Sequence, residues 1–481
     1  MQYHTGLLWF RNDLRLHDHE ALSKALEQCK KVVPVYCLDP RQFEKTPFGF
    51  PKTGMFRAKF LSESLQNLAA KLKEKNSGLL IRVGKPEEVL PSIAKEYQAK
   101  AVFYHKEITQ EEISVEESLE EKLFQIGVNF EGFWGSTLYH IDDLPMPVSA
   151  LPEIFTQFRK QVEKLSSPRE LLPTPDQISS PTIPDTDAAA IAYLQTPTLL
   201  PESRSVLSFK GGETEAFKRL HNYFWESDSL KVYKETRNGL LGENYSSKFS
   251  PWLAHGCISP RKIYHEVKRY ESLRVKNSST YWLIFELIWR DYFKYVAKKH
   301  KNTLFFPGGI KDERPHTIES PDRLEKWIEG KTGIPFVDAN MRELKLTGFM
   351  SNRGRQNVAS FLVKDLQLDW RAGAEYFESQ LIDYDVCSNW GNWNYVAGIG
   401  NDPRENRYFN VVSQAKRYDP RGEYVRTWIP ELEELPSAHV HEPHKLPPGQ
   451  LKGYAVSLGS SYPHPLVKLK SPKPSYAKKK Y

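Results

Sequence analysis

Residues 244–253 bring together side chains that could hold a phosphate. Three hydroxyls precede Pro251, and the backbone N–H groups of a helix that starts there would be free to donate to an anion. The competing interpretation is a serine-capped helix with proline in its first turn. Both interpretations remain open. The hydroxyls belong to Ser246, Ser247 and Ser250.

Residues 281–295 are apolar nearly all round, which predicts a buried helix. Glu286 and Arg290 are four residues apart on it and share a face, with Trp289 beside them. One interpretation is an ion pair between neighbouring turns. The other is a charged stripe that lines an internal pocket, since an unpaired charge inside such a helix would be costly.

Residues 349–400 predict a polar pocket within an apolar domain. Residues 351–356 open a helix with two arginines, and Asp383, Asp385 and several amides follow among aromatic residues. The chain shows no Ser/His/Asp order, no zinc-ligand spacing and no isolated acid pair of the hydrolase type. A bound cofactor is therefore expected to do the chemistry, and no metal is expected.

The first part of the chain must position such groups through an α/β fold. Strand-like runs over 6–10, 32–38, 79–84, 101–105 and 128–135 alternate with helical stretches near 18–29, 54–75, 86–98 and 111–126. This alternation predicts a doubly wound parallel sheet, which binds ligands beyond the carboxyl ends of its strands. Neither a G-x-G-x-x-G run nor a P-loop accompanies it.

The remainder divides into three further regions. We expect an α/β domain over 1–140, a connector over 141–204, a helical domain over 205–435 and a Pro/Lys-rich tail over 436–481. Residues 166–204 hold seven prolines, and nine of the eleven tryptophans lie from Trp225 onward. The end of the tail, 471–481, is expected to be disordered.

Composition excludes several classes of protein. The chain has 481 residues, 40% of them hydrophobic and 26% charged, which is typical of a globular protein with more than one domain. A strand from Gly6 leaves no room for a leader, no run is long enough to span a membrane, and four scattered cysteines argue against a secreted scaffold. We expect a cytoplasmic monomer. Residues 205–430 carry a net charge of +7, which suits a polyanion-binding surface or a solvated face.

Several longer motifs resemble the cryptochrome/photolyase family. Residues 9–19 (WFRNDLRLHDH), 286–291 (ELIWRD) and 352–355 (NRGR) carry the resemblance to the family. Residues 348–360, 388–395 and 398–404 are similar to its DASH branch, and the similarity runs from 6 to about 435.

The resemblance implies a helical domain that holds FAD in a U-shape. Asn389 matches the residue that faces flavin N5, where an amide can accept from a protonated nitrogen or donate to a bare one. Arg355 and Asp383 match a charge pair beside the flavin ring, which can tune an anionic reduced flavin. The residues that match cofactor contacts are Tyr233, Ser246, Ser247, Ser250, Arg290, Arg355, Asp383, Asp385 and Asn389, with Asn352 in the set around the flavin end.

The resemblance also implies light-driven repair of cyclobutane pyrimidine dimers by electron transfer from reduced FAD. Glu286 matches a residue that hydrogen-bonds the dimer and Trp289 one that packs against it, so Glu286, Trp289, Asn352 and Asn389 form the expected catalytic set. Gln356 and Tyr395 stand where other photolyases carry Met and Trp. A smaller apolar contact with the lesion offsets less of the free energy needed to flip the lesion out of a duplex. A preference for single-stranded DNA is therefore expected.

Two further roles follow from the resemblance. Trp393 and Trp370 match the inner members of a tryptophan chain for flavin photoreduction, whereas the outermost position holds Thr317. For both tryptophans the alternative is an ordinary place in the core. Glu107 matches a contact to a 5,10-methenyltetrahydrofolate antenna, and the alternative is a surface acid.

Three functions remain open on the sequence alone. The first is a DASH-type photolyase of single-stranded DNA. The second is a blue-light photoreceptor that acts on nucleic-acid or protein partners without repair. The third is a light-independent nucleotide-binding protein, which would carry no flavin. Residues 466–481 hold six lysines and no acid, which suits non-specific contacts with duplex DNA or RNA, or only a solvated end.

Overall fold

The computed structural model describes residues 1–184, 190, 202–403 and 408–469. Its first part is a five-stranded sheet in the order β3-β2-β1-β4-β5, and every neighbouring pair is parallel. The predicted doubly wound sheet is confirmed. The strands are β1 (Tyr3–Phe10), β2 (Cys29–Leu38), β3 (Leu80–Val83), β4 (Ala101–His105) and β5 (Asn129–Phe133).

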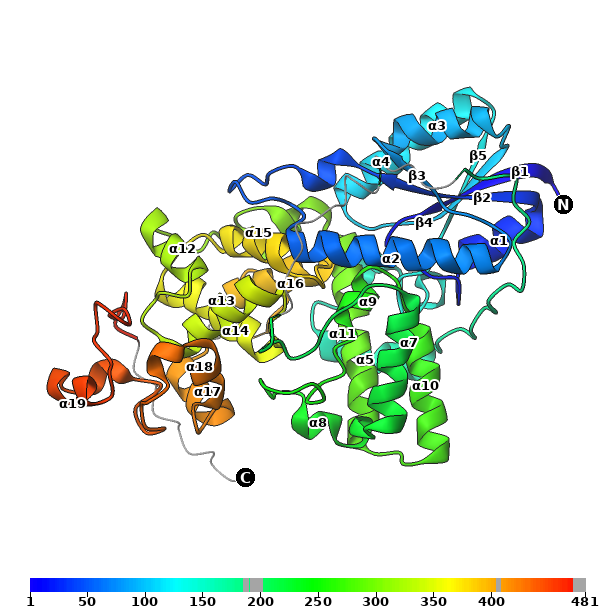
Figure 1. The fold of residues 1–481 in the computed structure, drawn as a ribbon. Coiled ribbons are helices and arrows are strands. Elements are labelled where there is room, and N and C mark those ends of the chain that lie inside the picture. The colour runs from blue at the N-terminus through cyan, green and yellow to red at the C-terminus, as the bar shows by residue number, and fades with distance from the viewer. Residues whose placement is uncertain (185–189, 191–201, 404–407, 470–481) are drawn as a thin grey trace.

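Side chains alternate between two cores because successive residues of a strand point to opposite faces. On β1, Leu8 and Phe10 pack in the core that includes α1 and α2, while Leu7 and Trp9 pack in the core under α3 and α4. Figure 1 shows these helices on the two faces of the sheet. They are α1 (Glu20–Gln28), α2 (Met55–Glu74), α3 (Pro86–Glu96) and α4 (Gln110–Gln125).

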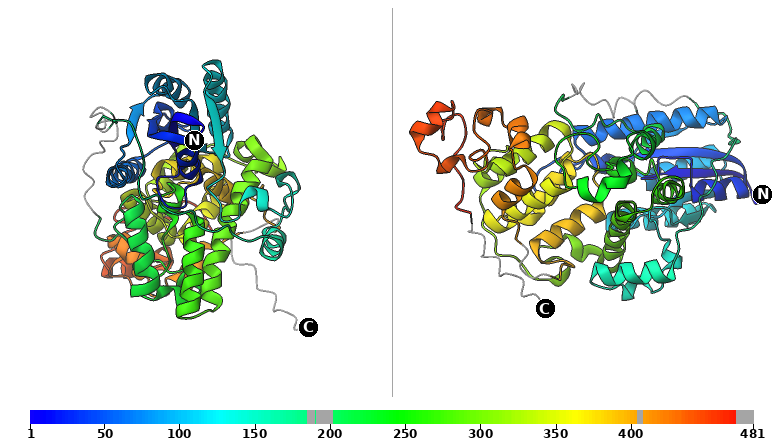
Figure 2. Two further views of the ribbon diagram at one scale, coloured as in Figure 1. Left: turned by 90° about the vertical axis from the view of Figure 1, so that its right-hand side faces the viewer. Right: turned by 90° about the horizontal axis from the view of Figure 1, so that it is seen from below.

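The second part is helical, as predicted, and extends away from the sheet to the opposite end of the molecule (Figures 1 and 2). Helix α2 runs along the sheet and also contacts α7 and α15, so it ties the two parts together. The helices are α7 (Glu213–His221), α8 (Tyr233–Thr236), α9 (Ser250–Ala254), α10 (Pro260–Leu273), α11 (Ser278–His300), α12 (Pro321–Ile328), α13 (Pro335–Thr347), α14 (Asn352–Ser360), α15 (Trp370–Gln380), α16 (Val386–Ala397), α17 (Val411–Tyr418), α18 (Glu423–Trp428) and α19 (Pro448–Gly453).

The region expected as a connector contains a helix. Helix α5 (Phe155–Leu165) packs on α11, and its residues Phe155, Phe158 and Val162 are buried. Residues 166–184 form no helix or strand, and the rest of the proline-rich stretch, 185–201 apart from Ala190, lies outside the described residues.

The first two thirds of the expected tail is folded. Val440, Leu451, Val456 and Tyr462 are buried in one core with Tyr424 and Trp428, and the Tyr462 hydroxyl donates to Asp338 over 2.5 Å. The predicted disorder of 471–481 falls outside the described residues. Among the described helices, none is long and apolar enough to cross a membrane.

Candidate cofactor and substrate site

A cavity opens between α14, α15 and α16 in the helical part. It holds about 600 Å³ of space, part of which is open to solvent. Its polar lining comes from the third segment singled out in the sequence, and its apolar lining includes Phe377, Leu381, Trp393 and Val396. The polar residues are Asn352, Arg355, Gln356, Asp383, Asp385, Ser388, Asn389 and Asn392, with Tyr384.

The charge pair expected beside the flavin is formed. Arg355 donates through Nη2 to both carboxylate oxygens of Asp383, at 3.0 and 2.8 Å, and through Nε to the Met350 carbonyl at 2.9 Å. Ser351 caps α14 by accepting from the Gly354 N–H, which fixes the start of the helix that carries Arg355. Asp383 is buried, whereas the Arg355 side chain is partly open to the cavity.

Asn389 presents an oxygen to the cavity. Its Nδ2 donates to the Ala374 carbonyl over 3.0 Å, and because a carbonyl only accepts, the side-chain oxygen must point elsewhere. The helix that holds it, α16, is capped by Asp385, which accepts from the Ser388 N–H. Sequence alone allowed Asn389 to face the cavity as either donor or acceptor, and this contact favours the acceptor.

Asp385 is held as a carboxylate beneath the cavity. Lys294, itself buried, lies 3.1 Å from it and Arg290 lies 3.9 Å away. Burial alone would raise the pKa of Asp385, but these two cations hold it well below its ordinary value. The site therefore keeps a fixed negative charge at neutral pH.

The serine-rich turn does not cap the helix that follows it. Phe249 stands at the N-cap of α9 without a side-chain bond, so the capping interpretation is wrong, although Pro251 does lie in the first turn. Arg219 instead fixes the turn by donating to the carbonyls of Ser246 and Ser247, each at 3.0 Å. Ser246, Ser247, Ser250 and Tyr233 are not among the described side chains that line the cavity.

Glu286 and Arg290 form no ion pair with each other, so the interpretation as a pair between turns is wrong. Glu286 pairs with Arg237 and accepts from the Trp282 indole N–H at 3.1 Å. Burial raises its pKa although Arg237 opposes this. Arg290 turns the other way and donates to the carbonyls of Ser136 and Leu253, at 2.5 and 3.1 Å.

Trp289 lies flat against a ring from outside the helical part. Its ring centroid is 3.6 Å from that of Phe155 on α5, with 11° between the planes. Tyr395 meets Trp289 edge-on at 6.2 Å. Phe155 was not predicted as part of the site, because the stack joins residues 134 positions apart in the chain.

The two tryptophans of the expected chain lie in the core, and Trp393 lines the cavity. The Trp393 ring occupies the space beside Gly373, where an added Cβ would overlap it, one turn from Trp370 on α15. Trp370 meets Trp390 edge-on at 5.6 Å. Thr317, at the outermost position, is exposed in the segment before α12.

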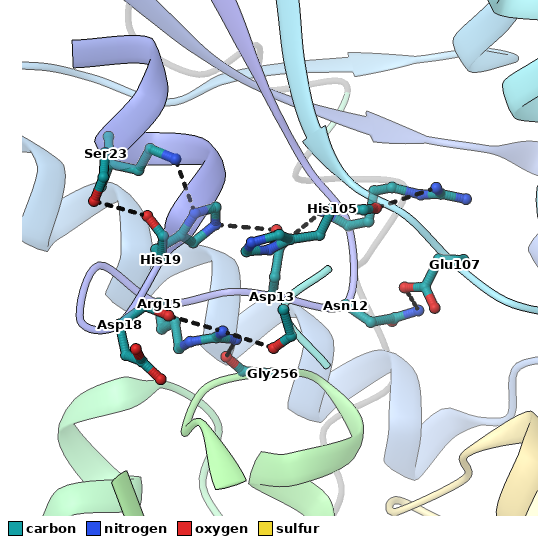
Figure 3. Close-up of polar contacts among 12 residues, drawn as sticks. Asn12, Asp13, Arg15, Asp18, His19, Ser23, His105, Glu107 and Gly256 are labelled. Carbon is teal, nitrogen blue, oxygen red and sulfur yellow. Dashed lines mark hydrogen bonds and ion pairs between the residues drawn. The ribbon is translucent and has the colours of Figure 1, made fainter. Parts of the chain in front are cut away.

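Glu107 lies at the carboxyl end of β4, where Figure 3 shows it facing Asn12. The Asn12 amide donates to it over 3.1 Å, and the carboxylate is half-buried rather than a free surface acid. Its partner Asn12 packs against Gly256 of the helical part, so Glu107 lies near the junction of the two parts.

A buried cluster of Asp13, His19 and His105 beside Glu107 was not predicted from the sequence. His19 Nε2 and His105 Nδ1 approach the same oxygen of Asp13, at 3.0 and 2.7 Å (Figure 3). His19 Nδ1 accepts from the Leu22 N–H, so its proton lies on Nε2, toward Asp13. A metal bound at His19 Nε2 would need a lone pair on that nitrogen, which this tautomer does not offer.

Comparisons with known proteins match this architecture. A family model described as the FAD binding domain of DNA photolyase matches residues 282–479, and one described as DNA photolyase matches residues 6–176. The chain is 54% identical over 471 residues to the Cryptochrome DASH of Synechocystis sp. PCC 6803, covering 96% of this chain and 95% of the relative. The chain belongs to the DASH branch of the cryptochrome/photolyase family.

Other members agree in sequence and in structure. Cryptochrome DASH of Danio rerio is 51% identical, over 96% of this chain and 90% of its own. The crystal structure of the Synechocystis cryptochrome superposes with a TM-score of 0.93 at 54% identity, over 96% of both chains. A class III photolyase of Agrobacterium tumefaciens gives 0.85 at 29% identity, over 97% of this chain and 95% of its own. The match to residue 479 extends the resemblance beyond 435, in keeping with the folded segment there.

The cavity fits the FAD that this family's domain binds. Apolar side chains suit the faces of a flat ring, while the Arg355–Asp383 pair and the Asn389 oxygen suit its polar edge. Such an arrangement makes the chain a blue-light flavoprotein of the photolyase fold.

Proposed function

We propose that this flavoprotein repairs cyclobutane pyrimidine dimers in single-stranded DNA under blue light. The observation that carries the proposal is the pairing of an FAD-type cavity with Glu286 and Trp289 on the adjoining α11. Bound FAD would supply the electron chemistry that opens the dimer and takes the electron back. The protein's own part is to bind and orient the lesion and to exclude water.

The proposed roles follow the side chains. Glu286, which Arg237 and Trp282 hold in place, would bond the dimer, and Trp289 would pack against it. Asn352 and Asn389 complete the catalytic set at the flavin end, and Gln356 and Tyr395 contact the substrate. The cofactor set is Tyr233, Ser246, Ser247, Ser250, Arg290, Arg355, Asp383, Asp385 and Asn389.

Single-stranded preference rests on the chemistry of two of these side chains. Gln356 is an amide and Tyr395 a phenol, and neither offers the apolar surface that would repay unpairing of a duplex. In a single strand that cost is largely absent, and stacking on aromatic rings supplies affinity. Repair of dimers at equal rates in single-stranded and duplex DNA would contradict this preference.

The test is repair by the purified holoprotein under blue light with a reductant. Loss of dimers from a single-stranded oligonucleotide, and slower loss from the matching duplex, is the expected result. Glu286→Gln is expected to lower single-stranded repair by one to two orders of magnitude, because it removes the carboxylate acceptor. Flavin absorption without any repair would instead favour the photoreceptor.

A photoreceptor without physiological repair is the second candidate. It is favoured by the same two residues, Gln356 and Tyr395, which depart from the pattern of other photolyases. The folate antenna at Glu107 is a separate proposal, supported by the place of that carboxylate beside Asn12, near the junction of the two parts. A second absorption band beside that of flavin, lost in Glu107→Ala, would be its signature.

A further inference from the structure

Arg353 on α14 donates hydrogen bonds to the amide oxygens of three side chains and to no carboxylate among the described residues. Its Nη2 donates to Asn238 Oδ1 at 2.7 Å and its Nη1 to Gln356 Oε1 at 2.8 Å, with Gln414 Oε1 at 3.5 Å. The guanidinium lies 4.4 Å above the Tyr418 ring. Among the described residues, no ion pair includes Arg353.

This contact fixes which end of the Gln356 amide faces the cavity. A guanidinium has donors and no acceptor, so only the amide oxygen can turn toward it. The NH₂ group of Gln356 must then point away from Arg353, and Gln356 is among the residues that line the cavity. Arg353 and Gln356 are three residues apart on one helix, so they share a face.

We propose that Arg353 is a positioning residue that turns the Gln356 amide nitrogen toward the substrate. That nitrogen donates to a carbonyl oxygen of a flipped pyrimidine, and pyrimidines carry such acceptors on their ring edges. The same guanidinium holds the oxygen of Asn238, so the NH₂ group of that side chain also points away from Arg353. The inference rests on the proposed function and deepens it, since it gives Gln356 a polar task where Met could only supply contact area.

A direct phosphate contact is the alternative role for Arg353, and Arg353→Lys separates the two. Lysine keeps the charge and binds phosphate, but it lacks the planar fork that holds two amide oxygens at once. If Arg353 acts through Gln356, the lysine variant leaves affinity for undamaged DNA and its salt dependence unchanged. Its preference for the dimer falls.

The measurement is binding in the dark of the FAD-loaded protein to a single-stranded oligonucleotide, with and without one dimer, at several salt concentrations. Gln356→Glu keeps an oxygen toward Arg353 but puts an acceptor where the donor was. We expect it to lower the preference for the dimer about 3- to 10-fold, the effect of one hydrogen bond. Arg353→Lys is expected to do the same, and the double variant to be no worse than either alone.

Arg417→Met is the matched control. Arg417 is exposed and lies over the same Tyr418 ring at 5.3 Å, and none of its described contacts is with Gln356. Loss of this charge should weaken binding of the damaged and the undamaged oligonucleotide equally, and so leave the preference for the dimer unchanged. Full dimer preference in Arg353→Lys or Gln356→Glu, with flavin content and thermal unfolding as in the wild type, would overturn the inference. A wild-type protein without any dimer preference would instead overturn the proposed function.

Discussion

Asn389 holds its amide nitrogen against the Ala374 carbonyl, and this leaves its oxygen as an acceptor at the cavity. An acceptor stabilises a flavin nitrogen that carries a proton, which belongs to the reduced cofactor. We therefore expect Asn389→Ala to lower the flavin reduction potential by tens of millivolts, the equivalent of one hydrogen bond. A redox titration followed by absorption measures this shift.

The control for that titration is Asn392→Ala. Asn392 also lines the cavity, but it is exposed and its nitrogen donates to the Ser388 carbonyl within its own helix. The flavin reduction potential of the Asn392→Ala variant should stay at the wild-type value. Equal shifts in both variants would point to a general change of the pocket and contradict the role given to the Asn389 oxygen.

Thr317 offers a second test at a single residue. It is exposed, and the Ile318 N–H beside it donates to the Gln367 carbonyl, three residues before Trp370. Thr317→Trp would place an oxidisable ring at the end of the tryptophan chain with little strain. We expect flavin photoreduction under blue light to become several-fold faster, as followed by the loss of oxidised-flavin absorption. His316→Trp, next to it and exposed, should have no effect.

Helix α5 packs from outside the helical part on the face of α11 that carries Trp289. Phe155 and Phe158 are both buried on it, but only Phe155 stacks on Trp289, while Phe158 packs on Tyr292 and Tyr295. Phe155→Leu should therefore weaken dimer binding several-fold because Trp289 loses its stacking partner. Phe158→Leu should lower the unfolding temperature to a similar degree and leave dimer binding intact.

A buried histidine at the end of β4, His105, packs against His19 of the segment that joins β1 to α1, and it makes stability depend on pH. Burial lowers the pKa of His105 to about 4 from 6.5, with His19 adding to the effect. Between those values the unfolded chain binds a proton that the folded chain refuses, so stability falls as the pH drops from 6.5 to 4. The loss is on the order of 3 kcal/mol for this group. Thermal unfolding across that range measures it, and His105→Asn should flatten the slope.

Element positions followed from the sequence more closely than contacts did. Periodicity was enough for the five strands and for α11, because alternation and apolar faces are local properties. The Arg237–Glu286 pair and the Asp13–His19–His105 cluster join residues that the chain brings together only on folding. The position of a polar side chain such as Arg353 in the sequence shows no periodicity that indicates its partners. Its hydrogen bonds could therefore not be predicted.

At the scale of the molecule, the segment after α18 belongs to the fold. Tyr462 and Val440 are fully buried against Trp428 and its neighbours. A chain ending at residue 435 would expose that core, and we expect it to unfold at a markedly lower temperature or to aggregate. A chain ending at 469 should melt like the full protein. Equal melting of all three would contradict the place given to this segment.

The shorter deletion also tests the lysines. If residues 470–481 contact nucleic acid, their removal lowers affinity for single-stranded DNA and reduces its salt dependence. An unchanged salt slope would leave those lysines as a solvated end. Either result is independent of dimer preference, because the substitutions expected to alter that preference lie in the folded part of the chain.

The stack of Phe155 on Trp289 bears on how this fold can be recombined. The Tyr292 hydroxyl donates to the Pro152 and Glu153 carbonyls, and Arg159 bonds the Tyr281 hydroxyl, so α5 is fastened along α11. A chimera that joins the sheet of one relative to the helices of another should therefore cross over before residue 151. A crossover near 205 would pack α5 of one parent against α11 of the other, and the rings at the positions of Phe155 and Trp289 would come from different parents.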